Sequence, residues 1–190
     1  MPARQILKIT LLGDGAVGKT SMRTRFMGRG FTPTHLMTIG ADFAAVDKTI
    51  NYNGTDYHVT FQIWDLAGQA RFTEVRARFY FGSLGGLCLF DITNPESFQN
   101  ISNWINEIWK NSGTGAVPLI LVGNKSDLRD GKSVQVKKVQ EYCDQLTKNT
   151  REHGFDVIYI ETSAKSGENV DKAFDALGKW ILAKRASERK

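Results

Sequence analysis

Short, mostly apolar segments alternate with amphipathic ones along the chain. The runs at residues 6–12, 84–92, 117–123 and 155–160 are rich in strand-forming residues, and those at 84–92 and 117–123 predict strands buried on both faces. Between the runs, apolar residues recur every three to four positions. This spacing predicts helices after the first strand, from Asn94, over 134–149 and around 173–181.

Residues 42–51 and 55–65 alternate in the manner of strands, with Asn53-Gly54 between them. Asn-Gly between two such runs is the strongest short-range signal for a β-hairpin, because both turn positions need positive φ. A weakly helical segment follows, up to about Phe81. The whole pattern predicts an α/β fold with three layers, in which a six-stranded, mostly parallel sheet carries one antiparallel edge strand.

The composition fits one well-buried domain. The chain has 190 residues, of which 41% are hydrophobic and 24% charged. No apolar run approaches the roughly 18 residues that a membrane span needs, and the first residues lack the apolar stretch of a signal peptide. Cys88 and Cys143 lie in apolar or helical patterns, which predicts buried thiols and a reducing, cytoplasmic setting.

The formal charge of +5 raises the question of an anionic partner. The basic residues are neither gathered into a reading helix nor interleaved with aromatic residues, so no nucleic acid is predicted. The densest run lies between Lys179 and Lys190. At about 1 kcal/mol for each base near an anionic membrane, it supports reversible adhesion at best, and a solvated helix end is the simpler interpretation. We therefore predict a domain over residues 1–182 and a basic tail over 183–190.

Gly13-Asp14-Gly15-Ala16-Val17-Gly18-Lys19-Thr20 fits the pattern G-x-x-x-x-G-K-[ST]. It lies between a predicted strand and a predicted helix, where backbone N–H groups converge on a phosphate. Lys19 is expected to reach the outer phosphates, and the Thr20 hydroxyl to bind Mg²⁺. A plain glycine turn before a lysine is the alternative. The residues expected to contact a nucleotide here are Gly15, Ala16, Val17, Gly18, Lys19, Thr20 and Ser21.

Asn124-Lys125-Ser126-Asp127 follows another predicted strand. Its aspartate can accept from both N1–H and the 2-amino group of guanine, whereas adenine has an acceptor at N1. The asparagine is expected to brace the loop, and the lysine stem to lie along the base. Ser163-Ala164-Lys165 is expected to close the other side, with the Ala164 N–H on the guanine O6. The four-residue pattern from Asn124 to Asp127 also occurs in ordinary turns. Together with a phosphate loop on the same sheet, it predicts a binding site for guanine.

Asp65-Leu66-Ala67-Gly68-Gln69 ends a third strand. We expect the aspartate to hold Mg²⁺ through water, the Gly68 N–H to meet a γ-phosphate and Gln69 to orient the attacking water as the catalytic residue. Thr38, in the polar loop 28–40, suits a third contact to Mg²⁺. A strand that ends in a turn is the alternative. Ligands bind at the carboxyl ends of strands in such sheets, and all these motifs fall there.

Together these residues resemble the Ras-like small GTPases, and most closely the Rab branch, over nearly the whole chain. The resemblance is carried, in the family's order and spacing, by Gly13 to Thr20, Thr38-Ile39-Gly40, Asp65 to Gln69, Asn124 to Asp127 and Glu161 to Lys165. Features similar to Rab proteins are Ile39 to Phe43, Phe61 to Asp65, Arg71-Phe72 and Ser97-Phe98 with Trp104. The resemblance implies the G domain fold of P-loop NTPases.

The resemblance also implies further roles. Phe31 matches the aromatic residue that packs on the guanine, and Phe43, Trp64 and Tyr80 resemble the aromatic triad of the Rab effector surface. Packing under the switch loops is the alternative for the triad. Gly15 stands where a side chain would crowd Gln69. Three arginines lie near the site in the sequence, namely Arg71, Arg76 and Arg78. Contact with a partner protein is the favoured role for them.

The implied function is a monomeric, GTP-dependent switch that slowly hydrolyses GTP to GDP and phosphate, with Mg²⁺ as cofactor. Loops 30–42 and 65–80 would be ordered by the γ-phosphate. An activating protein would supply an arginine that raises the hydrolysis rate roughly 10³-fold to 10⁵-fold. The activating protein, an exchange factor and effectors would all bind residues 30–45 and 64–80. The setting is cytoplasmic or peripheral at a membrane, in membrane trafficking or cytoskeletal signalling.

Several residues depart from the family pattern. Ala70 replaces an acidic residue of the usual exchange-factor contact, Ala44 replaces a lysine, His35 an aromatic residue and Leu66 a threonine. Rab proteins usually end in prenylated cysteines, whereas the last cysteine here is Cys143. Either the chain is truncated, or the protein works without a stable membrane anchor.

Two other functions remain open. A GTP-binding interaction protein with negligible hydrolysis is compatible with the changes at Ala70 and His35. A metabolic P-loop kinase would need an acceptor-substrate pocket and would have no use for Asn124 to Asp127.

Overall fold

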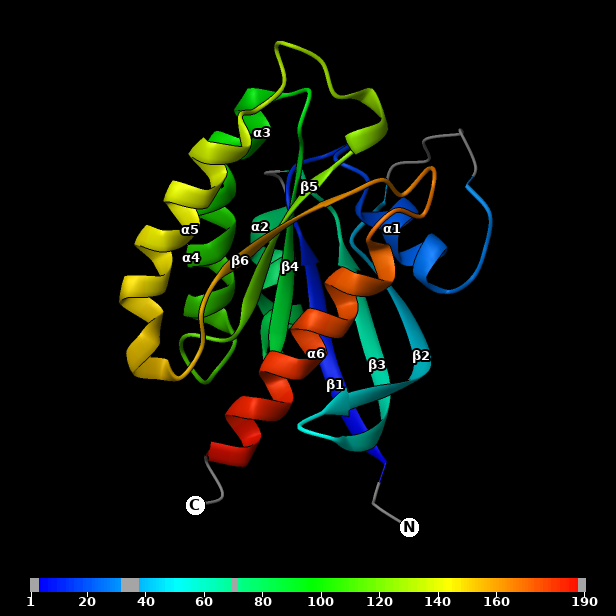
Figure 1. Ribbon diagram of the computed structural model, residues 1–190, viewed down its shortest axis with the longest axis vertical. Helices are drawn as coiled ribbons and strands as arrows, with labels where there is room; N and C mark the ends of the chain where they lie inside the picture. Colours follow the sequence, from blue (N-terminus) through cyan, green and yellow to red (C-terminus); the bar gives the residue numbers. More distant parts are fainter. Residues whose placement is uncertain (1–3, 32–37, 70–71, 188–190) are drawn as a thin grey trace.

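A six-stranded sheet forms the middle of the molecule in the computed structural model, which describes residues 4–31, 38–69 and 72–187 (Figure 1). The strand order is β2-β3-β1-β4-β5-β6, and every neighbouring pair is parallel except β2 and β3. This confirms the predicted α/β fold with one antiparallel edge strand. The strands are β1 (Gln5–Leu12), β2 (Ala41–Tyr52), β3 (Thr55–Leu66), β4 (Gly85–Asp91), β5 (Leu119–Asn124) and β6 (Ile158–Thr162).

The turn between β2 and β3 is the predicted one. Asn53 and Gly54 have φ of 50° and 77°, as a two-residue hairpin turn with two positive φ values requires. The turn sets a register in which Phe43 pairs with Trp64, so the two aromatic side chains lie next to each other on one face of the sheet.

The helices cover both faces of the sheet, as Figure 1 shows. On one face lie α1 (Lys19–Phe26) and α6 (Val170–Ser187). On the other lie α2 (Thr73–Tyr80), α3 (Pro95–Gln99), α4 (Ile101–Asn111) and α5 (Val136–Thr150). Two short 3₁₀ turns, η2 (Ser126–Leu128) and η3 (Arg151–His153), precede and follow α5. This is the predicted three-layer arrangement.

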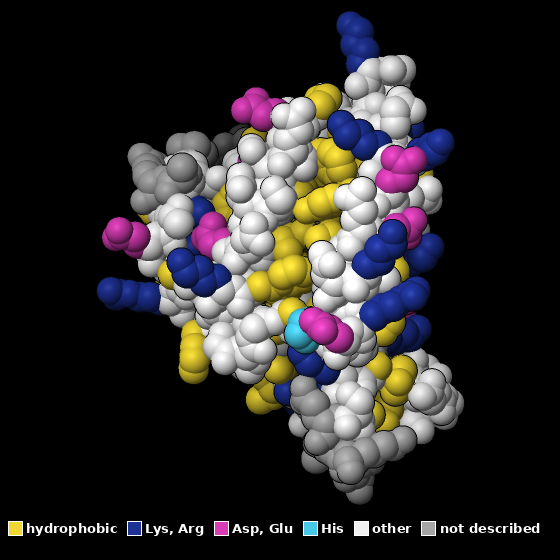
Figure 2. All heavy atoms as spheres, turned by 90° about the vertical axis from the view of Figure 1, so that its left-hand side faces the viewer, with side chains coloured by type: hydrophobic (Ala, Val, Ile, Leu, Met, Phe, Trp, Pro, Cys, Tyr) yellow, Lys and Arg dark blue, Asp and Glu magenta, His cyan; other side chains and the backbone are white. Residues whose placement is uncertain are grey.

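Each face of the sheet has its own apolar core. Under α1 and α6, the rings of Phe26 and Phe174 stack with centroids 3.8 Å apart. Under α3, α4 and α5, Phe90 packs against Phe98 and Tyr159. Complete burial of such a side chain stabilises the fold by about 1.5–3 kcal/mol. Figure 2 views the molecule from the side of α4 and α5, where partly buried apolar side chains show along the middle of the face.

The helix predicted from Asn94 is divided in two. Asn94 caps α3 by accepting from the Glu96 N–H at 3.1 Å, and α4 begins after Asn100. The Asn100 side chain donates to the Asp14 carboxylate at 2.8 Å. The division therefore lies at a residue that reaches across to the phosphate-loop motif.

Two other bounds differ from the prediction. The last strand starts at Ile158 rather than 155, because Thr150 Oγ1 donates to the Phe155 carbonyl and Thr147 Oγ1 accepts from the Val157 N–H. Helix α6 continues through Ser187, so the predicted tail over 183–190 begins inside this helix.

Cys88 and Cys143 are buried free thiols, as predicted. Burial raises the pKa of Cys88, and it raises the pKa of Cys143 to about 12. Both side chains therefore act as small apolar residues of the core. Across the described residues, no helix has the length and apolar character required to pass through a membrane.

Candidate functional site

The carboxyl ends of β1, β3, β5 and β6 meet at the end of the sheet that lies away from the two chain termini in Figure 1. Strands β1 and β4 are neighbours in the sheet, and the chain leaves β1 toward β2 but leaves β4 toward β5, in the opposite direction across the sheet. Such a switch point opens a crevice for ligands. We call this end of the sheet the rim.

The loop between β1 and α1 depends on glycines. Gly13 and Gly18 have φ of 133° and 98°, which other residues rarely adopt. A Cβ on Gly13 would lie 2.1 Å from the Leu89 carbonyl oxygen, and one on Gly18 would lie 2.2 Å from Asn124 Nδ2. Gly18 caps α1 without a side-chain bond from the described residues. The first N–H groups of α1 are therefore available to an anion.

Lys19 lies across this loop. Its Nζ donates to the Gly13 and Asp14 carbonyls, both at 2.7 Å. Burial lowers the pKa of Lys19 to about 8, although the Asp65 and Asp14 carboxylates partly oppose the shift. A buried ammonium held by two carbonyls is stabilised further by a phosphate.

The three residues predicted to bind a metal come together from three segments. Thr20 Oγ1 donates to Asp65 Oδ2 at 2.5 Å and lies 3.0 Å from Thr38 Oγ1. Asp65 is fully buried, and burial raises its pKa although the bond from Thr20 and the charge of Lys19 lower it. Its second oxygen, Oδ1, has no hydrogen-bond partner among the described residues.

This cluster fits Mg²⁺. Hydroxyl and carboxylate oxygens are ligands of the kind that Mg²⁺ prefers, and it usually keeps several waters. A buried carboxylate oxygen without a partner is unfavourable, and a hydrated cation would supply one for Asp65 Oδ1. In the part of the chain that the structure describes, no three His, Cys, Asp or Glu side chains gather into another candidate metal site.

Asn124 joins three loops of the rim. Its side chain is 1% exposed, donates from Nδ2 to the Val17 carbonyl at 2.9 Å and accepts on Oδ1 from Thr162 Oγ1 and the Ala164 N–H, both at 3.1 Å. The predicted bracing role is confirmed. The Ala164 N–H, however, bonds to Asn124 here, whereas the sequence analysis assigned it to a guanine O6. On contact with a base, the Ala164 N–H would either bond to Asn124 and the guanine O6 together or exchange the first acceptor for the second.

The predicted base-reading carboxylate is exposed at the rim. Asp127 Oδ1 accepts from Ser163 Oγ at 2.6 Å, which joins the two loops on this side. Lys125 has a φ of 69°, and its Nζ forms an ion pair with Asp91 at 2.6 Å. Burial of Asp91 acts to raise its pKa, but the bonds from Lys125 and Thr93 outweigh it, and the pKa is lowered.

Arg25 also belongs to this site, although the sequence did not predict it. From α1, its Nε donates to the Ala164 carbonyl at 3.0 Å, and its Nη2 donates to the Lys165 carbonyl. Lys165 itself is exposed. Nothing in the local sequence distinguishes Arg25 from a solvated helix residue, because its partners lie in a loop far along the chain.

The exit of β3 passes close to the phosphate loop. A Cβ on Gly68 would lie 2.4 Å from Gly15 N and from Asp14 C, so only glycine fits there. A Cβ on Gly15 would meet no heavy atom of the described residues within 4 Å. A Cβ at Gly15 would therefore not crowd Gln69, contrary to the prediction for a side chain at this position. The residue whose space is restricted is Gly68.

Arg76 is buried under this segment, although its place in the sequence favoured partner contact. Its Nη1 donates to the carbonyls of Ala67 at 3.0 Å and Gln69 at 2.6 Å. The partner contact favoured for Arg76 is wrong, because its side chain is 3% exposed.

One member of the predicted aromatic triad is also wrong. Phe43 is 46% exposed and lies 5.1 Å from Trp64, whose other neighbour at 5.2 Å is Phe79. Tyr80 is fully buried and its hydroxyl donates to Glu107 at 3.2 Å. Residues 76 and 80 share one face of α2 because they are four positions apart. Phe43, Trp64 and Phe79 are the aromatic residues that lie against one another here, and we call these three the triad.

The remaining predicted residues are placed as follows. Ser21 is half-buried in the first turn of α1, and Phe31 is 36% exposed. Ala44 and Leu66 are buried. His35, Ala70 and Arg71 lie outside the described residues, and the predictions made for them stay predictions.

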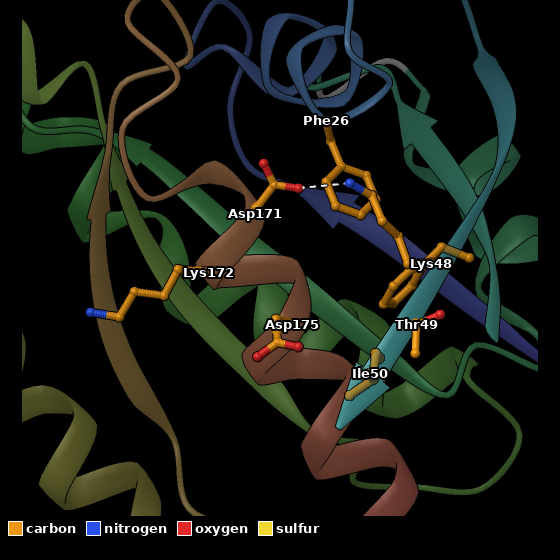
Figure 3. A pocket seen from close by; sticks show the side chains of 8 residues that line it. Phe26, Lys48, Thr49, Ile50, Asp171, Lys172 and Asp175 are labelled. Atoms are coloured by element: carbon orange, nitrogen blue, oxygen red, sulfur yellow. Dashed lines mark hydrogen bonds and ion pairs between the residues drawn. The ribbon is translucent and has the colours of Figure 1, made fainter. Parts of the chain in front are cut away.

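A hollow of about 400 Å³ lies between β2 and α6 (Figure 3). Its lining includes Phe26 and Ile50, and an ion pair of 2.9 Å joins Lys48 on β2 to Asp171 on α6. It contains none of the predicted site residues.

Known proteins resemble this chain over nearly all of its length. A model of the Ras family matches residues 8–183. The Ras-related protein Rab-13 of Bos taurus is 40% identical over 184 residues, which cover 97% of this chain and 84% of the relative. The Ras-related protein Rab7 of Drosophila melanogaster is 37% identical, with 94% and 82% covered. The Ras-related protein Rab-27B of Homo sapiens is 34% identical, with 93% and 80% covered.

Proposed function

Because the chain belongs to the Ras family, and within it to the Rab branch of GTP-binding switch GTPases, we propose that its rim binds GTP and that Gln69 orients the attacking water. Ras-family GTPases use GTP, GDP and Mg²⁺ in general. The observation that carries the proposal for this chain is the cluster of Thr20, Thr38 and Asp65, with one buried carboxylate oxygen left without a partner.

The residues of the phosphate side take the following roles. The first N–H groups of α1 bind the phosphates, and Lys19 exchanges its two carbonyl partners for phosphate oxygens. Thr20 and Thr38 bind Mg²⁺, and Asp65 binds it through water. When bound, the cation neutralises charge that develops on the phosphates. The Gly68 N–H meets the γ-phosphate from the loop that lies against Gly15.

On the base side, Asp127 accepts hydrogen bonds from N1–H and from the 2-amino group of guanine. The bond that Ser163 Oγ donates to Asp127 Oδ1 holds the carboxylate in position. Asn124 keeps the three surrounding loops in register. The Lys125 stem and the Phe31 ring lie along the two faces of the base. Lys165 completes the closing loop, whose carbonyls Arg25 holds.

Thr38 and Gln69 lie in the two switch loops. Loss of the γ-phosphate removes the contacts that order both loops, which changes the surface that they present. Without an added arginine the turnover is slow, since such an arginine is worth roughly 10³–10⁵ in rate. An activating protein supplies it.

Regulators and effectors bind the surface formed by residues 30–45 and 64–80. Its exposed apolar residues support this, since Ile39 is 80% exposed and Val75 44% exposed, and the same residue ranges contain the triad of Phe43, Trp64 and Phe79. The protein acts as a monomer in the cytoplasm and peripherally at a membrane surface, as a switch in membrane trafficking or cytoskeletal signalling.

Identification of the nucleotide released from purified protein tests the proposal. We expect GDP or GTP, and release of ATP would contradict it. The variant Asp127→Asn should shift the preference from guanine to xanthine nucleotides, because the amide can donate to the xanthine 2-oxo group. Asp130→Asn, another exposed carboxylate three residues further, is the matched control. Unchanged guanine preference in Asp127→Asn would refute the base-reading role.

A further inference from the structure

Arg76 is a buried arginine of α2 whose N–H groups all have acceptors. Its five N–H donors make one bond each to Ala67 O, Gln69 O and Thr73 Oγ1, and two to Glu107. The two bonds to Glu107, of 2.8 and 3.0 Å, form a bidentate pair with the carboxylate. A lysine cannot reproduce this fork, because its donors radiate from one atom.

Apart from Thr73 on its own helix, the acceptors of Arg76 lie on two different parts of the fold. Ala67 and Gln69 belong to the segment between β3 and α2, whereas Glu107 belongs to α4. Helix α4 is fixed on the sheet by Ile105 and Ile108, which are buried in the core. Arg76 therefore ties the segment that leads out of β3 to a helix that is part of the core.

The same helix also holds the phosphate loop. The guanidinium carbon of Arg76 lies 4.5 Å from the centre of the Trp104 ring, and Trp104 Nε1 donates to Asp14 Oδ1 at 2.7 Å. Asn100, at the start of α4, donates to the other oxygen of Asp14 at 2.8 Å. Side chains of α4 and of Asn100 at its start thus hold the phosphate loop directly, and Glu107 of α4 holds the segment of Gln69 through Arg76.

We propose that Arg76 is a positioning residue for GTP hydrolysis, which acts by fixing the main chain of Ala67 and Gln69 on α4. This rests on the proposed role of Gln69. With its carbonyl held at 2.6 Å, the Gln69 peptide has a fixed orientation, and its side chain starts from a defined point opposite the phosphate loop. Glu107 has the secondary role of orienting the guanidinium.

The proposal predicts a specific kinetic defect. A misplacement of about 1 Å at a reacting group lowers a rate by up to roughly 10². Arg76→Lys keeps the charge but not the fork, so its single-turnover rate constant for GTP hydrolysis should fall roughly ten-fold to hundred-fold. Nucleotide affinity should remain within about two-fold, because none of the five bonds reaches a residue of the phosphate loop.

The experiment compares two variants with two controls in the full chain. Arg76→Lys and the isosteric Glu107→Gln are measured beside Arg151→Lys and Glu141→Gln, which change exposed residues of η3 and α5. Single-turnover hydrolysis, affinity for a fluorescent GDP analogue and the melting temperature are recorded for each. Glu107→Gln should show the defect of Arg76→Lys in weaker form, and the controls should behave as the wild type. If Arg76→Lys is unfolded at the assay temperature, Glu107→Gln alone decides.

Combination with Gln69→Leu tests whether Arg76 acts through Gln69. The proposal expects Gln69→Leu with Arg76→Lys to be no slower than Gln69→Leu alone. Losses that multiply would overturn it, since Arg76 would then act by another route. A wild-type rate in both Arg76→Lys and Glu107→Gln would also overturn it, while a slow Gln69→Leu would leave the proposed function intact. A wild-type rate in Gln69→Leu itself would instead remove the catalytic role of Gln69, and the positioning role with it.

Discussion

Asn124 and Thr38 lie on opposite sides of the rim, and the bonds that hold them differ in kind. Asn124 is buried and bonds to three loops through groups that stay inside the protein. Thr38 meets Thr20 through a pair of hydroxyls that are only half-buried, next to a carboxylate oxygen without a partner among the described residues. On the proposed base side, Asn124 is thus fully bonded without a ligand, whereas the proposed phosphate-sensing side has a buried carboxylate oxygen that a ligand would satisfy.

A binding site with two such sides can also act as a switch. A side held by buried, fully paired groups keeps its shape in both nucleotide states. A side whose groups gain partners only with the ligand shifts the populations of its conformations when the ligand changes. Four substitutions test this comparison.

Asn124→Ala should have the largest effect, because it leaves the Val17 carbonyl and the Ala164 N–H buried without their partner. Each such group costs about 1–3 kcal/mol. We expect nucleotide affinity to fall on the order of 10³-fold, together with a lower melting temperature. Calorimetric titration with GDP measures the first and thermal unfolding the second. Asn106→Ala on the exposed face of α4 is the control. A small effect would mean that the base side is not held as described.

Asp65→Asn should come next, and it acts on the sensing side. The amide keeps the shape but loses the charge that faces Thr20 and the proposed cation. Bonds to charged groups are worth about 1.5–3 kcal/mol, so the Mg²⁺ concentration needed to slow GDP release should rise roughly 10-fold to 150-fold. The measurement is GDP release against Mg²⁺ concentration. Asp56→Asn, an exposed residue at the start of β3, should leave the titration unchanged.

Trp104→Phe separates the two groups that α4 supports. The phenyl ring can remain beside Arg76, but the donor to Asp14 is lost. At about 0.5–1.5 kcal/mol for one hydrogen bond, nucleotide affinity should weaken roughly 2-fold to 12-fold, while the hydrolysis rate of the bound nucleotide stays close to that of the wild type. Trp109→Phe removes a comparable bond, to the Val117 carbonyl, nearer the other end of the same helix. An equal loss of affinity in Trp109→Phe would show that the effect is general to α4.

Tyr80→Phe should have the smallest effect. It removes only the hydroxyl that donates to Glu107, for about 1 kcal/mol of stability and a decrease of roughly 2–4 °C in melting temperature. Effector binding should not change, whereas Phe79→Ala should weaken it, because the Phe79 ring is the one that lies against Trp64. The reverse result would restore Tyr80 to the triad.

Local signals predicted the parts of the molecule that local chemistry decides. The turn at Asn53-Gly54 and the positive φ at Gly13 and Gly18 follow from residue types that tolerate those conformations. The meeting of Thr20 and Asp65 was also predictable, because parallel strands end at the same edge of a sheet.

Contacts between distant segments were not predictable in the same way. Helix α2 has apolar or aromatic residues on several sides, so the sequence does not show which side turns inward. Packing against α4 decides it, and it buries Arg76 and Tyr80 while Phe79 faces Trp64. Arg25 is a similar case, since its acceptors come from a loop far along the chain.

The end of α6 lies beside the beginning of the chain. Arg185 donates to the Gln5 side chain at 3.2 Å and to the Ile6 carbonyl at 3.3 Å, and Lys184 donates to the Ala116 carbonyl at 2.9 Å. Both ends lie opposite the rim (Figure 1). A fluorescent label or a surface attachment at either end therefore leaves the rim and its neighbouring aromatic residues accessible. A short linker between the ends would also allow circular permutation, with new termini at the exposed Asn53-Gly54 turn.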